Sequence, residues 1–497
     1  MKNIKQQISP STLKQLFQKA TFLLAAIFLG AAIGIQPKLS LYLGGFVGLI
    51  VYIILAYRRI FTAFILLAFF ALTVWFSSIK LVGNLSIMIG IGGVFTGVWL
   101  SRLLIRPLPW VKVKEYRLLF GLIIIVFLSA LFNAGSPAGF SPVMTYLQLF
   151  LLFILTVNVV LTPNQLYVLG LVIVFSSVVL AIVILLDQWG VLPAGLIVAQ
   201  TAGVDIGTYR AVVARTGGLW GDANFTALQL TIALPFVIQW WFVKRIWWQR
   251  IILLVSGGMI LLAFTYTFST GGFLGLLTIL VLQVLIAKRR NILSLLRVVL
   301  LIFLAIGILF LVLPDLYVQR LEIKLTDLIV AILSRDWDLL LLAGSGRGDT
   351  WMAGIKSIID APVIGHGPGN AAFVNVRHSL IYSNRERIAS HNMYLTVGVD
   401  LGLAGLVLFI GLLIASLRAV EVSLRYQTNG SVFLATGKAL FIALAAYMVQ
   451  GLAIDAHNMK LLWILLGMTI VYRQLFTQQF RQLQVRGHSD KSSASCR

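Results

Sequence analysis

The chain has 497 residues, of which 60% are hydrophobic and 11% are charged, whereas a soluble domain carries about 25% charged residues. Because the shortage of charge extends along the whole sequence, a soluble protein with a single membrane anchor is excluded. The net charge of +23 does not indicate nucleic-acid binding, since most cations lie in short segments between apolar runs. The single cysteine, Cys496, excludes an internal disulfide framework and a cysteine metal cluster.

Apolar runs of about 20 residues recur, and each could cross about 30 Å of hydrocarbon as a helix. Short alternating strands are not evident, so we expect an all-α polytopic bundle of 12–14 transmembrane helices. In chain order the candidate spans are 20–36, 39–57, 60–79, 84–101, 118–134, 142–162, 165–186, 225–243, 250–268, 271–287, 296–314, 393–417, 436–455 and 460–477. The first run lacks a small-residue cleavage site, so we interpret it as a helix rather than a signal peptide.

The basic residues predict the orientation of the bundle. With the N-terminus in the cytoplasm, the cytoplasmic segments hold most of the 39 lysines and arginines, and short outer loops hold almost none. We therefore expect a cytoplasmic segment 1–19, a membrane region 20–314 with an outer loop at 187–224, a large outer loop 315–392, further spans over 393–477, and a cytoplasmic tail 478–497. The large loop is too long and polar for a simple connector, which favours a functional role. Its stretches Leu325–Leu333 and Met352–Ile359 are compatible with helices at the membrane surface.

A histidine marks the end of the large loop. His391 and Asn392 stand directly before the span 393–417, so the imidazole lies at the outer membrane interface. A histidine there can be neutral near pH 7 and can accept a proton. The alternative is a histidine that only caps the helix or anchors it at the headgroups.

Two arginines on the outer side are candidate anion ligands. Arg347 lies between Gly346 and Gly348, which would let the backbone approach a ligand, and its guanidinium suits a phosphate. Arg215, with Arg210 nearby, precedes a span in a chain whose short outer loops lack cations. The alternatives are a solvated loop arginine, an ion pair with Asp349 or Asp222, and a lipid headgroup contact.

No metal site is predicted. Asp336-Trp337-Asp338 has the spacing by which nucleotide-sugar enzymes hold a divalent cation, but two carboxylates are a weak signal. His366 lies between two glycines and is explained by loop structure as readily as by chemistry. Asp455 and His457 lie at another outer membrane boundary and could position the residues that contact a substrate.

Several of these residues also form a pattern. His391-Asn392, nine residues and then Gly402-Leu403-Ala404-Gly405 resemble the histidine motif of bacterial O-antigen ligases. Gly346-Arg347 with Trp351, followed by the stretch Pro362–Gly369, resembles a second motif of that family, and Arg215–Asn224 resembles its first arginine-bearing outer loop. The resemblance covers about residues 210–475.

The resemblance implies a C-type glycosyltransferase architecture and a multi-pass protein of the bacterial inner membrane, with a periplasmic active site. Such an enzyme moves a glycan from undecaprenyl pyrophosphate to the hydroxyl of a lipid-borne or glycan acceptor, without a metal or another cofactor. By this resemblance His391 would be the base and Arg215 and Arg347 would bind the pyrophosphate. Where many members carry Ser-Arg, this chain reads Ser269-Thr270-Gly271, which leaves Arg320 as a substitute and Arg210 as a further candidate. The expected supporting residues are Asn392, Asp222, Asn224, His366, Gly402 and Gly405.

Three other functions stay open. A polymerase of the same superfamily joins one carrier-linked glycan to another, and a protein-glycosylating relative uses a protein acceptor. A transporter, such as a bicarbonate-uptake protein, belongs to a different class. Transporters place charged or broken-helix residues near the bilayer midplane, and Asp400 is the clearest mid-span carboxylate here.

Overall fold

The computed structural model describes residues 37–73, 80–82, 85–105, 110–192, 199–206, 209–244, 246–287, 337–425 and 431–494, and a few residues between 322 and 334. The predicted segment 1–19, the predicted spans 20–36 and 296–314, and Arg320 lie outside these residues. The chain forms two compact units, and every element from α6 onward belongs to the second.

The first unit contains apolar helices and a short hairpin. Its elements are α2 (Pro37–Arg58), most of α3 (Ile60–Thr73), β1 (Lys80–Val82), β2 (Leu85–Ser86) and α5 (Ile87–Ile105). The ring of Phe64 on α3 is buried, and its centroid lies 5.9 Å from that of Phe95 on α5. The predicted spans 39–57, 60–79 and 84–101 thus each overlap one helix.

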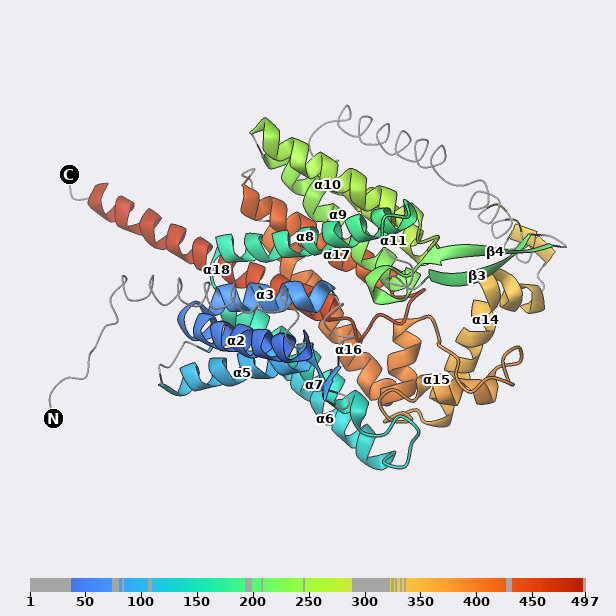
Figure 1. Cartoon of the computed structure of the whole chain (residues 1–497). Helices are drawn as coiled ribbons and strands as arrows, with labels where there is room; N and C mark the ends of the chain where they lie inside the picture. The colour runs from blue at the N-terminus through green and yellow to red at the C-terminus, as the bar shows by residue number, and fades with distance from the viewer. Residues whose placement is uncertain are drawn as a thin grey trace. The chain divides into compact units, whose positions relative to one another are not determined.

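The second unit contains the longer helices and all candidate site residues (Figure 1). Its helices before the large outer loop are α6 (Tyr116–Phe132), α7 (Ser141–Val159), α8 (Pro163–Gln188), α9 (Ala223–Val243), α10 (Trp247–Thr265) and α11 (Thr270–Ala287). After the loop come α16 (Met393–Arg425), α17 (Val432–Gln450) and α18 (Lys460–Ala494). The helix α18 continues through most of the predicted tail 478–497.

In the described part of the chain, seven helices are long and apolar enough to cross a membrane: α5, α7, α8, α9, α10, α16 and α17. The helices α6 and α11 are apolar but shorter. The chain is therefore an all-α, multi-pass membrane protein, as its composition predicts.

Side-chain caps fix where several of these helices begin. Thr162 and Gln165 form a capping box at the start of α8, with Pro163 in the first helical position. The carboxylate of Asp222 accepts the backbone N–H groups of Asn224 and Phe225 and so begins α9.

The helix α9 occupies the centre of the second unit. Thr231 of α9 and Gln450 of α17 exchange side-chain hydrogen bonds of 3.2 and 3.0 Å, and Trp240 donates to Thr436 at 3.1 Å. Small residues let the neighbouring helices approach closely, since a Cβ on Gly275 would collide with the Gln450 side chain. Polar pairs and small residues therefore hold the helices of this unit together.

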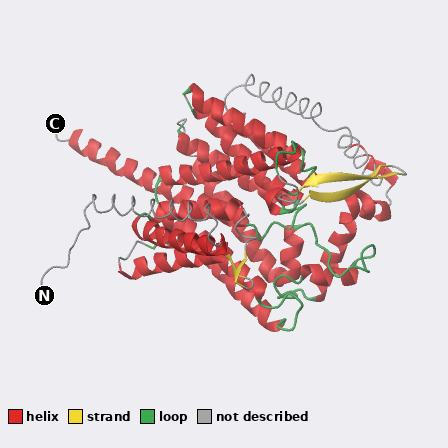
Figure 2. Cartoon of the chain, in the orientation of Figure 1, coloured by secondary structure: helices red, strands yellow, loops and turns green. Residues whose placement is uncertain are grey.

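The segment predicted as the outer loop 187–224 contains secondary structure that the sequence analysis did not predict. Short strands are present, because β3 (Ala199–Ile206) and β4 (Tyr209–Thr216) form an antiparallel hairpin, drawn in yellow in Figure 2. Gln200 pairs with Arg215, and Asp205 pairs with Arg210. The β-branched residues Val204, Ile206, Val212 and Val213 favour strands, and the segment is too short to register among long apolar runs.

The segment predicted as the large outer loop, 315–392, is partly helical. It contains α14 (Trp337–Asp360), α15 (Ala371–Val374) and the 3-10 turn η2 (Asn375–His378), so the predicted stretch Met352–Ile359 is helical. Figure 1 shows α14, α15 and the β3–β4 hairpin at the same end of the second unit. The stretch Leu325–Leu333 lies largely outside the described residues.

The helix α16 is interrupted near its start. Gly402 has φ 68° and ψ −174°, a backbone conformation that is essentially restricted to glycine. A Cβ at Gly402 would lie 2.3 Å from the carbonyl oxygen of Val363, and a Cβ at Gly365 would lie 2.5 Å from the amide nitrogen of Gly402. These two glycines therefore allow two backbone segments to meet at the break.

The stretch Pro362–Gly369 satisfies the backbone groups that the break sets free. Leu403 donates to the carbonyl of Pro362 at 2.7 Å, and His366 donates to that of Val399 at 2.9 Å. The buried carboxylate of Asp400 accepts the backbone N–H groups of Gly369 and Ala371 at 2.8 and 2.7 Å. Without such partners each polar group at membrane depth would cost several kcal/mol.

Candidate active site

His391 lies immediately before α16 in an unusual backbone conformation. Its φ is 49°, in the left-handed region that non-glycine residues rarely adopt. Asn392 caps α16, because its side-chain oxygen accepts the N–H groups of Tyr394 and Leu395 at 3.0 and 3.2 Å. His391 is therefore held outside α16, next to the first turn of that helix.

The carboxylate of Asp455, on the segment between α17 and α18, maintains this turn. It accepts the backbone N–H groups of His391 and Asn392 at 3.1 and 2.8 Å and the hydroxyl of Thr396 at 2.6 Å. Such hydrogen bonds to a charged acceptor are stronger than neutral ones. Asp455 thus positions His391 through its backbone.

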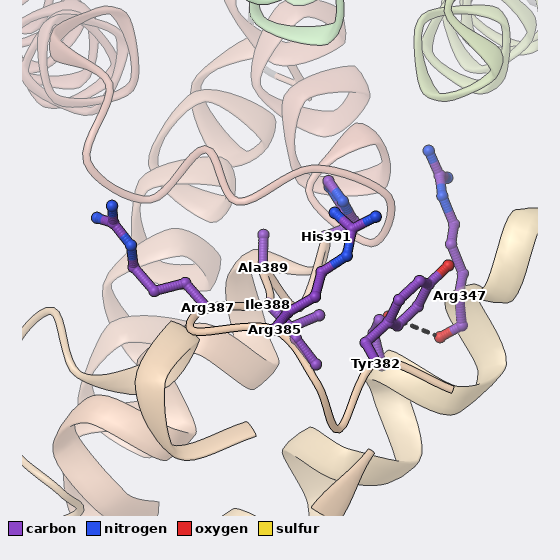
Figure 3. A pocket seen from close by; sticks show the side chains of 8 residues that line it. Arg347, Tyr382, Arg385, Arg387, Ile388, Ala389 and His391 are labelled. Carbon is purple, nitrogen blue, oxygen red and sulfur yellow. Dashed lines mark hydrogen bonds between the residues drawn. The ribbon is translucent and has the colours of Figure 1, made fainter. Parts of the chain in front are cut away.

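His391 borders a cavity of about 220 Å³. The other lining residues are Arg347, Thr350, Tyr382, Arg385, Arg387, Ile388 and Ala389. Figure 3 shows the side chains of Arg347, Tyr382, Arg385, Arg387 and His391 around this cavity. The cavity is strongly cationic, and His391 is its one imidazole among the lining residues.

The structure changes the interpretation of Arg347. Gly346, Arg347 and Gly348 belong to α14, so the flanking glycines do not form a loop that wraps a ligand. Asp349 is buried and does not pair with Arg347: its carboxylate accepts the Ser379 hydroxyl at 2.5 Å and the N–H of Leu380 at 2.9 Å. A helix, rather than a flexible loop, therefore presents the guanidinium of Arg347.

Arg215 ends β4 and is held by two neighbouring segments. Its Nε donates to the carbonyl of Thr267 at 3.0 Å, and its Nη2 donates to the Asn224 side chain at 3.1 Å. Ser269 donates to the same Asn224 oxygen at 2.9 Å. Ser269 thus supports the Asn224 side chain that binds Arg215.

Nearby charged groups affect the pKa of His391. Burial lowers the pKa of His391 below its usual 6.5, Asp455 raises it, Arg347 lowers it, Asp222 raises it and Arg215 lowers it, in decreasing order of effect. Both arginines are therefore close enough for their charge to act on the imidazole. The balance favours the neutral ring near pH 7, the form that can accept a proton.

The remaining predicted residues have other environments. The backbone of Arg210 lies on β4 five residues before Arg215, which is about 17 Å along a strand. The ring Nε2 of His366 lies 2.8 Å from the carbonyl oxygen of Ser357, and His366 lines a different cavity with Asn133 and Arg377. Gly402 and Gly405 belong to the broken helix and shape the fold around the cavity rather than its lining.

Among the residues that the structure describes, no group of three or more His, Cys, Asp or Glu side chains is placed to hold a metal ion. Asp336 and the side chain of Asp338 lie outside those residues. Asp455, the carboxylate nearest His391 along the hydrogen-bond network, is already bound by backbone and hydroxyl donors.

Sequence reasoning missed Tyr382, Arg385 and Arg387, which come from the loop that precedes His391. The signal was available, because Arg377, Arg385 and Arg387 form a dense group of cations in a segment that we predict to lie on the side of the membrane where cations are scarce. The length of the outer loop concealed it, since long loops obey that rule weakly.

The comparisons with known proteins bear on the same residues. Residues 251–410 match the family model described as O-antigen ligase. No curated protein matches the chain. The matched segment holds Arg347, the stretch Pro362–Gly369, His391 and Gly402, whereas Arg215 precedes it. This segment of the chain is therefore similar to the O-antigen ligase family.

Proposed function

We propose that the protein is an O-antigen ligase-like glycosyltransferase. It transfers a glycan from undecaprenyl pyrophosphate to an acceptor hydroxyl, such as that of a lipid A–core, at the periplasmic face of the bacterial inner membrane. The family implies lipid-linked glycan substrates and a membrane environment. The observation that carries the proposal is the neutral-leaning imidazole of His391 in one cavity with Arg347, under the added charge of Arg215.

The arginines would stabilise the leaving group. When the bond between the anomeric carbon and the phosphate oxygen breaks, negative charge grows on the lipid diphosphate. Fixed guanidinium groups oppose that charge without reorganisation, and their planar fork suits phosphate oxygens. The arginines would have the role that a divalent cation has in metal-dependent glycosyltransferases. We therefore expect glycan transfer to continue in the presence of a metal chelator.

His391 would act as the general base. The acceptor oxygen attacks the anomeric carbon, its proton passes to the imidazole, and undecaprenyl pyrophosphate leaves with the electron pair of the broken bond. Attack opposite the leaving group inverts the anomeric centre. General-base help is worth about 10²–10⁴-fold, so loss of the imidazole alone would leave a residual rate from binding and charge stabilisation.

A polymerase of the same superfamily would use the same cavity with a second carrier-linked glycan as acceptor. A broken helix can form the binding site of a transporter, but the break in α16 gives little support to that alternative. Both oxygens of Asp400 accept backbone N–H groups, and Ser129 donates to its carbonyl at 2.8 Å, so the break is occupied by protein.

Replacement of His391 by alanine in the native host tests the proposal. We expect carrier-linked glycan to accumulate and mature glycoconjugate to fall about 100-fold or more. His378→Ala is a matched control, because His378 is in the same loop and its Nε2 contacts the exposed Asp360 carboxylate at 2.6 Å. Normal glycoconjugate in the His391 variant, with impaired uptake of a solute, would instead favour transport.

A further inference from the structure

The second unit contains a second cavity, of about 330 Å³. Its lining comes from the turn after α6, from the segment that includes Pro362–Gly369, and from α15 and η2. Its polar lining residues are Asn133, Ser136, His366, Asn370 and Arg377, and none of them lines the cavity of His391. The volume lies at the lower end of the range for small-molecule sites, which is about 300–1,000 Å³.

Hydrogen bonds between distant segments fix the polar wall of this second cavity. The side-chain oxygen of Asn370 accepts the backbone N–H of Ala138 at 3.0 Å, and its amide donates to the Ser136 hydroxyl at 2.8 Å. The amide of Asn133 donates to the carbonyl of Gly365 at 3.2 Å. Asn370 is only 1% exposed, so water does not compete for its partners. The wall is therefore ordered before a ligand binds, which lowers the cost of binding.

The polar side chains of the wall retain both acceptors and donors for a ligand. The Asn133 amide uses both N–H groups on backbone carbonyls, and its oxygen accepts no hydrogen bond from the described residues. The Ser357 carbonyl, 2.8 Å from Nε2 of His366, can only accept, so Nε2 carries the proton and Nδ1 of the neutral ring is a second acceptor. The Ser136 hydroxyl accepts from Asn370 and can still donate.

Arg377 adds a single cation to this wall. Its side chain is exposed and has no ion pair or hydrogen bond within the part of the chain that the structure describes. The cavity of His391, by contrast, is lined by three arginines. One cation among amides, a hydroxyl and an imidazole suits a ligand rich in hydroxyl groups, because hydroxyls both donate and accept. A polyanion would leave the two acceptors of the wall without a donor, which is unfavourable.

The two cavities border the same pair of side chains. Phe373 lines the second cavity, and Arg387, which is drawn in Figure 3, lines the first. The guanidinium of Arg387 lies 5.5 Å from the ring centroid of Phe373, which is a cation–π contact. A ligand that extends past this pair would reach from one cavity into the other. A glycan is such a ligand, and the Phe373 ring offers an apolar surface to the C–H groups of a sugar.

We infer that the second cavity is a saccharide-binding subsite, which takes a sugar unit of the glycan whose reacting end lies at His391. This inference rests on the proposed function, because the transferase brings the glycan to His391. The sugar belongs either to the carrier-linked donor or to a glycan acceptor, since both present the same hydroxyl chemistry.

The first test measures binding to the purified full-length protein in detergent micelles. The probe is the lipid-free, phosphate-free glycan that mild acid releases from the mature glycoconjugate of the native host. We expect Arg377→Ala to weaken binding about 10-fold, as loss of a hydrogen bond from a charged group does. Arg377→Gln keeps N–H donors and should recover part of the affinity. Undecaprenyl pyrophosphate, which carries no sugar, should bind the wild type and Arg377→Ala equally.

Two further variants make the binding test specific. Ser136→Ala removes a hydroxyl from a different segment of the wall and should weaken glycan binding about 3-fold. Lys356→Ala is the matched control, because Lys356 is an exposed cation on α14 that lines neither cavity, and it should bind the glycan as the wild type does. Thermal unfolding of each variant separates a local effect from loss of folding.

Transfer kinetics identify which substrate occupies the subsite. Arg377→Ala should raise KM with little change in kcat, because Arg377 lies outside the cavity of the proposed base. A higher KM for the carrier-linked glycan alone assigns the subsite to the donor. A higher KM for the acceptor alone assigns it to the acceptor.

Wild-type glycan affinity in both Arg377→Ala and Ser136→Ala would overturn the inference, as would an equal loss of undecaprenyl pyrophosphate binding. Failure of the proposed function gives a different result. A wild-type protein that binds the glycan through Arg377 but transfers none contradicts the transferase and leaves the subsite intact. A wild type that transfers glycan, with unchanged KM for both substrates in both variants, contradicts the inference alone.

Discussion

At the scale of single residues, the geometry separates the proposed base from the group that positions it. His391 faces the cavity, while Asp455 holds its backbone and that of Asn392 from behind. Asp455 also raises the pKa of His391, against the stronger effect of burial. One carboxylate therefore fixes the backbone of His391 and also contributes to the proton affinity of its imidazole.

The charge of Asp455 can be tested with Asp455→Asn, which keeps a side-chain acceptor oxygen. Removal of a group that raises the pKa should lower the pKa of His391 further, so the acid limb of the pH profile of kcat/KM should move to lower pH. The weaker base should also lower the plateau about 10-fold. Thr396→Val removes one hydrogen bond to Asp455 but no charge, and its acid limb should stay in place. An acid limb that moves to higher pH in Asp455→Asn would show that this assignment of charges is wrong.

At the scale of elements, the family's glycine stretch has a structural explanation. Pro362–Gly369 lies against the interrupted start of α16 and satisfies its backbone groups. The helix α14 carries Arg347 to the cavity, whereas Arg215, at the end of the hairpin β3–β4, acts on His391 through its charge. The break at Gly402 allows the stretch that follows α14 to pack against α16.

The break can be tested with Gly402→Ala. The new Cβ would be 2.3 Å from the Val363 carbonyl oxygen in a conformation that only glycine adopts, so we expect a loss of about 2–4 kcal/mol in stability. Gly411→Ala lies on the same helix, where the nearest atom to a Cβ is 3.7 Å away, and alanine favours helix. Thermal unfolding in one detergent would compare the two, and equal melting temperatures would contradict the role of Gly402.

At the scale of the whole second unit, one buried ion pair lies far from the cavity. Glu115, which is 1% exposed, accepts both terminal nitrogens of Arg473 at 2.6 and 2.8 Å. Ser129 of α6 contacts Asp400 near the cavity end of α16, and Glu115 lies 14 residues before it, about 21 Å along a helix. The ion pair thus joins the start of α6 to α18, at the end of α6 that is farther from Asp400.

Because Glu115 is buried, Arg473→Leu should leave an uncompensated charge and destabilise the protein by about 3–5 kcal/mol. The pair Arg425–Glu421 is exposed on both sides, so Arg425→Ala should change stability by less than about 1 kcal/mol. Chemical unfolding measures both effects, and glycan transfer per folded molecule should be unchanged in each. Loss of transfer in folded Arg473→Leu would show that this end of the unit communicates with the cavity.

The sequence by itself determined the class of the molecule and the identity of its main chemical groups. Long apolar runs without charge can satisfy their backbone only as helices in a bilayer, so the all-α membrane fold follows from composition. Motif spacing was enough to propose Arg347 and His391 as site residues, because both lie in short patterns that can be recognised without knowledge of the fold.

Only the tertiary structure decided how those groups meet. The register of β3 with β4 ends the hairpin at Arg215, and the contacts of Pro362–Gly369 with α16 depend on residues far apart in sequence. The cations of Arg385 and Arg387 are two residues apart, yet different aromatic rings turn them in different directions. The contact of Arg385 with Tyr382 is local, whereas that of Arg387 with Phe373 joins two segments of the chain and depends on how the chain folds back.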